Sequence, residues 1–247
     1  MIIDANTIQP DSTFEADVCI VGSGPAGLTL AREFANQPLD VIVLESGGFT
    51  SNRALKKLNE GTTDGDAYPN PRWGRQRQFG GTPHRWGIHI NNSVGNGARY
   101  APLDAIDFEK REYVPYSGWP ITREEMDPYY ERAQEHVGIG PYEYGTAYWE
   151  KPGFKPLDFG TGSLVSSMFQ FGSKDVWTKH HDDVTQKANN IRVITNASAV
   201  EVETDDGGEN VTGVRALNHT QQTVRVRATY VILAVGCIES ARLLLLS

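Results

Sequence analysis

The stretch DVCIVGSGPAGLTLAREFANQPLDVIVLESGG, residues 17–48, holds a strand, a glycine turn, a helix, a second strand and an acid in that order. The apolar run 18–21 is continuous, as expected of a strand buried on both faces. A helical stripe and a second apolar run, 41–44, follow the glycines. This order predicts a βαβ unit that binds a dinucleotide.

The glycine turn has the spacing G-x-G-x-x-G, and each glycine has a physical reason. Gly22 permits the tight turn, Gly24 lets a pyrophosphate approach the backbone, and Gly27 lets the helix pack against the strand. The positive end of that helix then faces the anion. Glu45 at the tip of the second strand is expected to accept hydrogen bonds from an adenosine ribose. No Arg or Lys occurs in residues 46–48, which disfavours a 2′-phosphate.

Composition excludes several classes of protein. The chain has 247 residues and a formal net charge of -8, which argues against nucleic-acid binding. Cys19 and Cys237 lie beside apolar runs and are expected to be buried free thiols, not a disulfide or a metal site. The N-terminus lacks a basic n-region and no apolar stretch is long enough to span a membrane. We therefore expect a cytoplasmic protein without membrane or metal.

Residues 72–100 form a basic, aromatic and glycine-rich segment that we expect to be a loop. Four arginines surround Gly80-Gly81, and two tryptophans are interleaved. In an acidic protein, such a loop suits a second contact on a planar, phosphate-bearing cofactor.

The middle of the chain predicts few regular elements. Thr122 to Glu125 is a capping box that starts a helix, and Gly138 stops it. A strand is expected at 164–171, and a helix capped by Ser173 follows. The pair His180 and His181 is not expected to be catalytic or to bind metal, because adjacent helical residues point about 100° apart.

The last third predicts a three-stranded meander, with strands at 199–203, 211–217 and 223–227. A separate, fully buried strand is expected at 229–236, and Gly236 at its carboxyl end allows close approach of a ligand. A helix begins at Ile238 and ends in four leucines that cover more than one helical face. We expect this helix to be buried on several sides and the isolated chain to aggregate through it.

Four motifs in order resemble the glucose–methanol–choline (GMC) oxidoreductases, which are FAD enzymes that oxidise alcohols and sugars. The motifs are GSGPAG with Glu45, FGGTPHRWG at 79–87, SGWPI at 117–121 before a Pro-Tyr-Tyr helix, and VILAVGCIESARLLLLS at 231–247. The resemblance implies an α/β, Rossmann-like FAD-binding fold with the meander and the start of a substrate or cap region. It also implies hydride transfer from a CH–OH substrate, with a base removing the hydroxyl proton.

The expected site combines the residue analysis with this resemblance. It places the FAD pyrophosphate on the glycine turn, the flavin along the loop from Gly80 to Gly87, the adenine near Val200 and the diphosphate-ribose near Gly236. The expected cofactor-binding residues are Gly22, Ser23, Gly24, Pro25, Ala26, Gly27, Glu45, Ser46, Arg77, Gly80, Gly81, Thr82, Trp86, Gly87, Val200, Ala234 and Gly236.

Two departures from the family matter. Arg85 stands before Trp86, where some members carry the histidine that binds flavin covalently, and His84 is one place off, so FAD is expected to be non-covalent. No position matches the family's catalytic histidine, so the catalytic residue is unknown. The resemblance implies that 1–247 is the N-terminal part of a longer enzyme, with a missing C-terminal half or complementary chain as its partner.

The domain organisation expected from the resemblance is discontinuous. The FAD-binding core comprises approximately 15–50, 72–100 and 190–247, and a cap or substrate-side segment comprises approximately 101–189. Two alternatives stay open at this point. One is a non-catalytic FAD-binding subunit or remnant, and the other is an NAD-dependent dehydrogenase or flavoprotein reductase, because G-x-G-x-x-G alone does not separate NAD from FAD.

Overall fold

The computed structural model describes residues 1–66, 68, 70–90, 94–153, 155–157, 159–160, 162, 164–173, 176–179, 183–184 and 186–247. Within it the chain forms two compact units. The first comprises Met1–Arg85 with Trp177–Ser247, and the second comprises Trp86–Val176. The chain passes from the first unit to the second after Arg85 and returns after Val176. The predicted boundaries between the core and the cap segment lie near residues 100 and 190.

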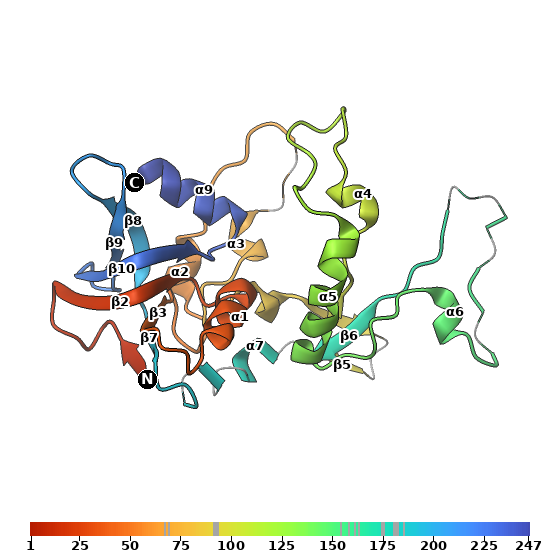
Figure 1. Ribbon diagram of the computed structural model, residues 1–247, viewed down its shortest axis with the longest axis horizontal. Helices are drawn as coiled ribbons and strands as arrows, with labels where there is room; N and C mark the ends of the chain where they lie inside the picture. Colours follow the sequence, from red (N-terminus) through yellow and green to blue (C-terminus); the bar gives the residue numbers. More distant parts are fainter. Residues whose placement is uncertain are drawn as a thin grey trace. The chain divides into compact units, whose positions relative to one another are not determined.

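A seven-stranded mixed sheet organises the first unit (Figure 1). Its order is β1 (Ile2–Asp4), β7 (Ile191–Thr195), β3 (Val41–Leu44), β2 (Ser12–Val21), β10 (Thr223–Leu233), β9 (Val211–Leu217) and β8 (Ser198–Thr204). The pairs from β1 to β10 are parallel, and β10, β9 and β8 pair antiparallel. The predicted α/β fold is confirmed, and its meander is part of the same sheet.

Pairing explains why β2 has two kinds of sequence. Its first half, Ser12–Asp17, alternates between exposed and half-buried residues, and the register there runs only along β10. From Val18 onward β2 pairs with β3 on one side and β10 on the other, and Val18–Val21 is buried throughout. A strand between two neighbours and covered on both faces needs apolar residues at every position.

The two strands predicted at 223–227 and 229–236 are wrong as separate elements. The structure has one strand, β10, that keeps a continuous parallel register with β2 up to Leu233. Its pairing with β9 ends at Arg227. Beyond that point β10 pairs with β2 alone, so it is not fully buried as predicted, and Tyr230 is 65 % exposed.

The first unit also contains helices. They are α1 (Pro25–Glu33), α2 (Arg53–Lys57), α3 (Pro71–Gly74), the 3₁₀ turn η1 (Thr82–Arg85) and α9 (Cys237–Leu246), and α7 (Val176–Lys179) spans the boundary of the units. Helix α1 contacts β2 and β3, and α9 contacts β8.

Within this chain, helix α9 is buried on one side. Leu243 is 2 % exposed, whereas Leu244, Leu245 and Leu246 are exposed. Its last turn has a local hydrogen-bond partner, because the Ser247 hydroxyl donates to the Leu243 carbonyl at 2.7 Å. The same hydroxyl accepts from the Val202 amide of β8 at 2.8 Å, which fixes the end of the helix to the sheet.

The second unit contains a three-stranded antiparallel sheet, β4 (Gly87–Ile90), β5 (Val94–Tyr100) and β6 (Gln170–Ser173). Three predictions are wrong here. The strand expected at 164–171 lies instead at Gln170–Ser173. Residues 87–100 were expected to be loop but carry two strands, and Ser173 ends β6, whereas it was expected to cap a helix. The pair His180 and His181 lies outside the described residues.

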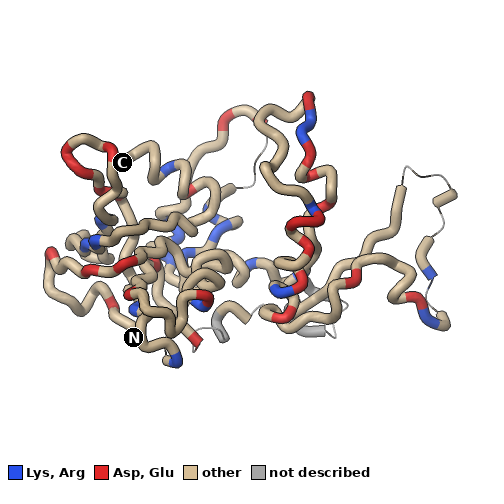
Figure 2. Tube along the Cα trace, in the orientation of Figure 1, with Lys and Arg blue, Asp and Glu red and all other residues tan. Residues whose placement is uncertain are grey.

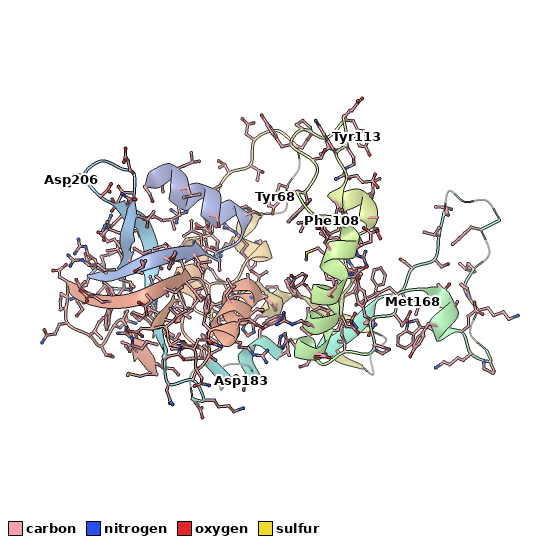
Figure 3. All side chains as sticks on the ribbon, viewed as in Figure 1. Tyr68, Phe108, Tyr113, Met168, Asp183 and Asp206 are labelled. Carbon is pink, nitrogen blue, oxygen red and sulfur yellow. The ribbon has the colours of Figure 1, made fainter. Side chains whose placement is uncertain are left out.

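Helices α4 (Ala105–Phe108), α5 (Arg123–Val137) and α6 (Thr146–Trp149) complete the second unit. Helix α5 has the predicted capping box, Thr122 with Glu125, and ends at Gly138 in the left-handed region. Acidic residues recur along α5 (Figure 2). Phe108 on α4 packs on Trp119 at 6.1 Å, while Tyr113 in the connection is exposed (Figure 3). No helix in the described part of the chain is long and apolar enough to cross a membrane.

Candidate dinucleotide-binding site

Three parallel strand ends converge on Gly22. The Gly22 amide donates to the Leu44 carbonyl of β3 at 2.7 Å, and the Ala234 amide after β10 donates to the Val21 carbonyl at 2.8 Å. Gly22 has φ +101°, and a Cβ there would lie 2.8 Å from the Ala234 carbonyl oxygen. Ligands of parallel sheets bind at such carboxyl ends, so the predicted glycine turn, Glu45 and Ala234 share the appropriate edge.

The other two glycines of the turn differ in what surrounds them. A Cβ on Gly27 would lie 1.9 Å from the Gly22 carbonyl oxygen, so the packing of α1 on β2 requires glycine there. Gly24 has an ordinary φ of -72°, and in the part of the chain that the structure describes no heavy atom beyond its chain neighbours lies within 4 Å of its Cβ position. The fold itself does not need glycine at 24, whereas the approach of a pyrophosphate does.

The N-terminus of α1 is open to an anion. It begins with Pro25 after Gly24, no side chain caps it, and its first turn carries no acid. The first-turn amides of a helix, here including those of Ala26 and Gly27, have no intrahelical acceptor. Amides and helix dipole together fit a phosphate group.

Glu45 is buried and fixed by three donors. The Ser23 hydroxyl and amide donate to its Oε2 at 2.6 and 3.0 Å, and the Gly47 amide donates to its Oε1 at 2.8 Å. Glu45 is 5 % exposed and Ser23 is fully buried. An ionised carboxylate has about four acceptor positions, so it retains capacity for a ribose hydroxyl.

The segment Arg77–Gly81 runs along two glycine turns, the one after β2 (residues 22–27) and the one after β3 (Gly47 and Gly48). The Phe79 amide donates to the Gly48 carbonyl at 3.0 Å, and the Gly80 amide donates to the Ser23 carbonyl at 3.1 Å. A Cβ on Gly81 would lie 2.8 Å from the Gly24 Cα, and one on Gly47 would lie 2.4 Å from the Arg77 carbonyl oxygen. These approaches bring the predicted Gly80 and Gly81 to the glycine turn.

The remaining predicted residues lie in four places. Ser46 Oγ is 2.6 Å from Ser198 Oγ at the start of β8, the strand that carries Val200. Gly236 caps α9 with φ +81° and, like Gly24, has open space at its Cβ position. Thr82 Oγ1 accepts from the Gln76 amide at 3.4 Å. Trp86 and Gly87 belong to the second unit, where Trp86 meets Tyr100 edge-on at 6.3 Å.

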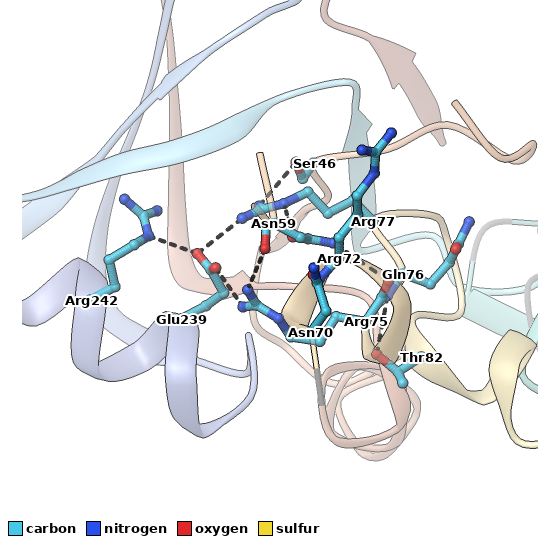
Figure 4. A network of polar contacts seen from close by, with 10 residues as sticks. All are labelled: Ser46, Asn59, Asn70, Arg72, Arg75, Gln76, Arg77, Thr82, Glu239 and Arg242. Atoms are coloured by element: carbon cyan, nitrogen blue, oxygen red, sulfur yellow. Dashed lines mark hydrogen bonds and ion pairs between the residues drawn. The ribbon is translucent and has the colours of Figure 1, made fainter. Parts of the chain in front are cut away.

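Sequence reasoning missed Glu239, which lies in the first turn of α9 and is 8 % exposed. Its Oε1 lies 2.6 Å from Arg75 Nη1, and its Oε2 lies 3.0 Å from Arg77 Nη2 and 2.8 Å from Arg242 Nε (Figure 4). Burial alone would raise the pKa of the Glu239 carboxyl, but the charge of Arg77 and the hydrogen bonds from Arg242 and Arg75 outweigh it and lower that pKa.

Asn59 completes this network from the end of α2. Its Oδ1 accepts from Arg77 Nε at 2.7 Å, and its Nδ2 donates to the Arg75 carbonyl at 3.4 Å. Arginines crowded in an acidic protein signal that an acid must lie nearby. That signal does not select Glu239, because the chain has 31 acidic residues.

Comparisons with known proteins show the family of the chain. The model of the FAD dependent oxidoreductase family, DAO, matches residues 17–245. A 6'''-hydroxyparomomycin C oxidase of Streptomyces lividus is 27% identical over 288 residues, which cover 94% of this chain and 50% of the relative. A paromamine 6'-oxidase of Streptomyces fradiae is 28% identical over 277 residues, with 94% and 49% covered. The chain thus spans about half the length of the curated relatives it matches.

Solved structures show the same fold. A crystal structure of formate oxidase has a TM-score of 0.52 at 17% identity and covers 97% of this chain and 48% of that one. A formate oxidase variant from Aspergillus oryzae has a TM-score of 0.51 at 16% identity, with the same coverage.

Proposed function

The chain belongs to the family of FAD-dependent oxidoreductases, and from this premise we propose that it holds FAD non-covalently and acts on CH–OH groups of sugars or other alcohols, as a GMC-type enzyme. The cofactor that we propose is FAD and not NAD, because the matching family is one of FAD enzymes.

The free space at the Cβ position of Gly24 is the observation that best supports a cofactor site at this turn. The backbone conformation of Gly24 suits any residue. Among the described residues beyond its chain neighbours, no heavy atom lies within 4 Å of its Cβ position, and no described side chain caps the helix that it precedes. Gly236 is similarly open at the carboxyl end of the neighbouring strand. Gly24 follows β2 and Gly236 follows β10, and neither carries a side chain. A diphosphate that lies across the ends of these two neighbouring strands fits such exposed backbone.

The flanking residues supply the rest of the cofactor contacts. Glu45, oriented by Ser23 and Gly47, accepts hydrogen bonds from the adenosine ribose. Ser46 and Val200 face the adenine end, and Gly80, Gly81 and Thr82 of the first unit follow the flavin. A flavin contact of Trp86 and Gly87 stays a prediction from the GMC resemblance. When bound, FAD supplies the two-electron acceptor for oxidation of the carbinol carbon.

The relatives support the proposed substrate class. Two of them are named as oxidases of 6'''-hydroxyparomomycin C and of paromamine, which are sugar-like small molecules. We assign cofactor binding, and no catalytic base, to the residues of this chain. A further segment or partner chain that supplies the base stays a prediction from the GMC resemblance.

Reconstitution with FAD tests the cofactor site. The wild-type chain is expected to gain a flavin spectrum and to release intact FAD on acid precipitation. Gly24→Val is expected to weaken FAD binding by about 100-fold or more, equivalent to about 2.7 kcal/mol, with an unfolding temperature within about 4 °C of wild type. Gly61→Val is the matched control, because Gly61 also has an ordinary φ and open space at its Cβ position.

Two results would contradict the proposal. Equal flavin occupancy in Gly24→Val and Gly61→Val would show that the diphosphate does not approach residue 24. Flavin that stays with the acid-precipitated protein would show covalent attachment.

A further inference from the structure

Arg77 joins two parts of the site that are far apart in sequence. Its Nη1 lies 3.4 Å from Ser46 Oγ, next to Glu45, and its Nη2 lies 3.0 Å from Glu239 Oε2, three residues after Gly236. Asn59 engages the remaining nitrogen, Nε, at 2.7 Å (Figure 4). The three guanidinium nitrogens are thus held within the protein, and the Arg77 side chain is mostly buried.

Glu239 is the fixed end of this connection. Its carboxylate contacts Arg75, Arg77 and Arg242, and α9, which carries it, is fixed to the sheet by the buried Leu243 and by Ser247. Arg77 begins the segment Arg77–Gly81 that runs along the glycine turns, and Arg75 lies two residues before it. A guanidinium bound by a buried carboxylate in this geometry is oriented as well as neutralised.

We propose that Glu239 is a positioning residue for the ADP half of FAD. Through Arg77, Glu239 fixes the position of the end of β3 relative to the N-terminus of α9. The end of β3 carries Glu45 and Ser46, and the N-terminus of α9 carries Gly236. This inference rests on the proposed function and deepens it, because it names a residue that acts on FAD without touching it.

The network could also act on FAD through its net charge alone, and this explanation predicts the opposite change in FAD affinity for Glu239→Gln. Three guanidiniums against one carboxylate leave an excess of two positive charges, which by itself attracts a diphosphate. Glu239→Gln increases that excess, so a network that acts only through charge would bind FAD more tightly. A positioning network would bind it less tightly.

Arg77 and Arg242 provide a matched pair. Both contact Glu239 Oε2, at 3.0 and 2.8 Å, and each substitution by methionine removes one positive charge. Only Arg77 also reaches Ser46. A role in charge alone predicts a loss of FAD affinity for both variants, whereas positioning predicts a loss for Arg77→Met only.

Titration calorimetry with FAD and with ADP on the full chain tests the proposal. Glu239→Gln and Arg77→Met are each expected to lose about tenfold in affinity for both ligands, and the double variant is expected to lose no more than either single variant. Arg242→Met and Glu203→Gln are expected to bind like wild type. Glu203 pairs with Arg225 at 3.0 Å on the meander.

The outcomes separate the two proposals. Wild type that binds neither FAD nor ADP would overturn the proposed function. Wild type that binds both, with unchanged or tighter binding by Glu239→Gln, would overturn only the positioning role, as would a loss for both Arg77→Met and Arg242→Met. If Glu239→Gln does not fold, judged by circular dichroism, the arginine pair decides alone.

Discussion

The glycine turn, residues 22–27, and the arginine segment, residues 72–82, lie along one another at the same edge of the sheet but are held by different forces. The glycine turn is constrained by sterics, because Gly22 and Gly27 would place a Cβ within 2.8 and 1.9 Å of carbonyl oxygens. The arginine segment is constrained by charge, through Glu239 in a helix more than 150 residues away.

Because of this difference, the two regions should tolerate substitutions to different extents. A carbonyl oxygen that a new Cβ meets at 1.9 Å cannot move without breaking the turn, so the glycine turn tolerates little change at Gly27. A side-chain network can rearrange or admit water, so its loss costs a moderate amount of free energy.

The largest effect is expected at Gly27. Gly27→Ala places a methyl 1.9 Å from the Gly22 carbonyl oxygen and 3.3 Å from Ile20, so α1 must separate from β2. We expect a loss of about 4 kcal/mol or more in the free energy of unfolding, measured by urea denaturation. Gly24→Ala is the control and is expected to lose at most about 1 kcal/mol, the scale of a weaker helix cap. Similar stability of both variants would remove the steric distinction.

A moderate, pH-dependent effect is expected at Glu239. Its folded-state pKa lies below the ordinary value of 4.5, because the charges and hydrogen bonds of the arginines outweigh burial. Its contribution is therefore present above pH 4.5 and is lost as the pH falls through the folded pKa. Glu239→Gln is expected to cost about 2–3 kcal/mol at pH 7.

Urea denaturation of wild type and Glu239→Gln from pH 7 down to pH 3 measures this difference, which should shrink below pH 4.5. Glu203→Gln removes a more exposed ion pair and should cost less than about 1 kcal/mol at any pH. A Glu239→Gln difference that stays constant with pH would mean that the carboxylate charge does not stabilise the fold.

The smallest effect concerns two thiols, one before the glycine turn and one at the start of α9. Cys19 lies in β2 before the glycine turn, and burial raises its pKa to about 12. Cys237 begins α9 next to Gly236 and is exposed, contrary to the expectation that both cysteines are buried. A disulfide reagent at pH 8 should modify Cys237 quickly and Cys19 only after denaturation, because the thiolate is the reactive form.

Saturating FAD should slow the modification of Cys237 several-fold if the diphosphate lies at Gly236. Cys237→Ser is the control and should leave no fast-reacting thiol. An unchanged rate with FAD bound would move the diphosphate away from the start of α9.

The remaining errors of the sequence analysis have one physical origin. The meander pattern located the strands β8 and β9, but it divided β10 at Ala228, because alternation reports which face of a strand is covered and not which strand pairs with it. Residues 87–100 were expected to be loop for the same reason. Their glycines and polar residues give no apolar pattern, yet backbone pairing with Gln170–Ser173 makes β5 the centre of a sheet.

The sequence by itself determined the βαβ unit, the roles of Gly22 and Gly27 and the place of Glu45 at a strand end. These features depend on sterics and hydrogen bonds among residues that are close in the chain or on neighbouring strands, so spacing alone encodes them. Only the tertiary structure decided that Arg75 and Arg77 meet Glu239, and that Cys237 is exposed while Cys19 is not. A guanidinium can pair with any carboxylate that the fold brings near, so its partner is fixed by topology and not by spacing.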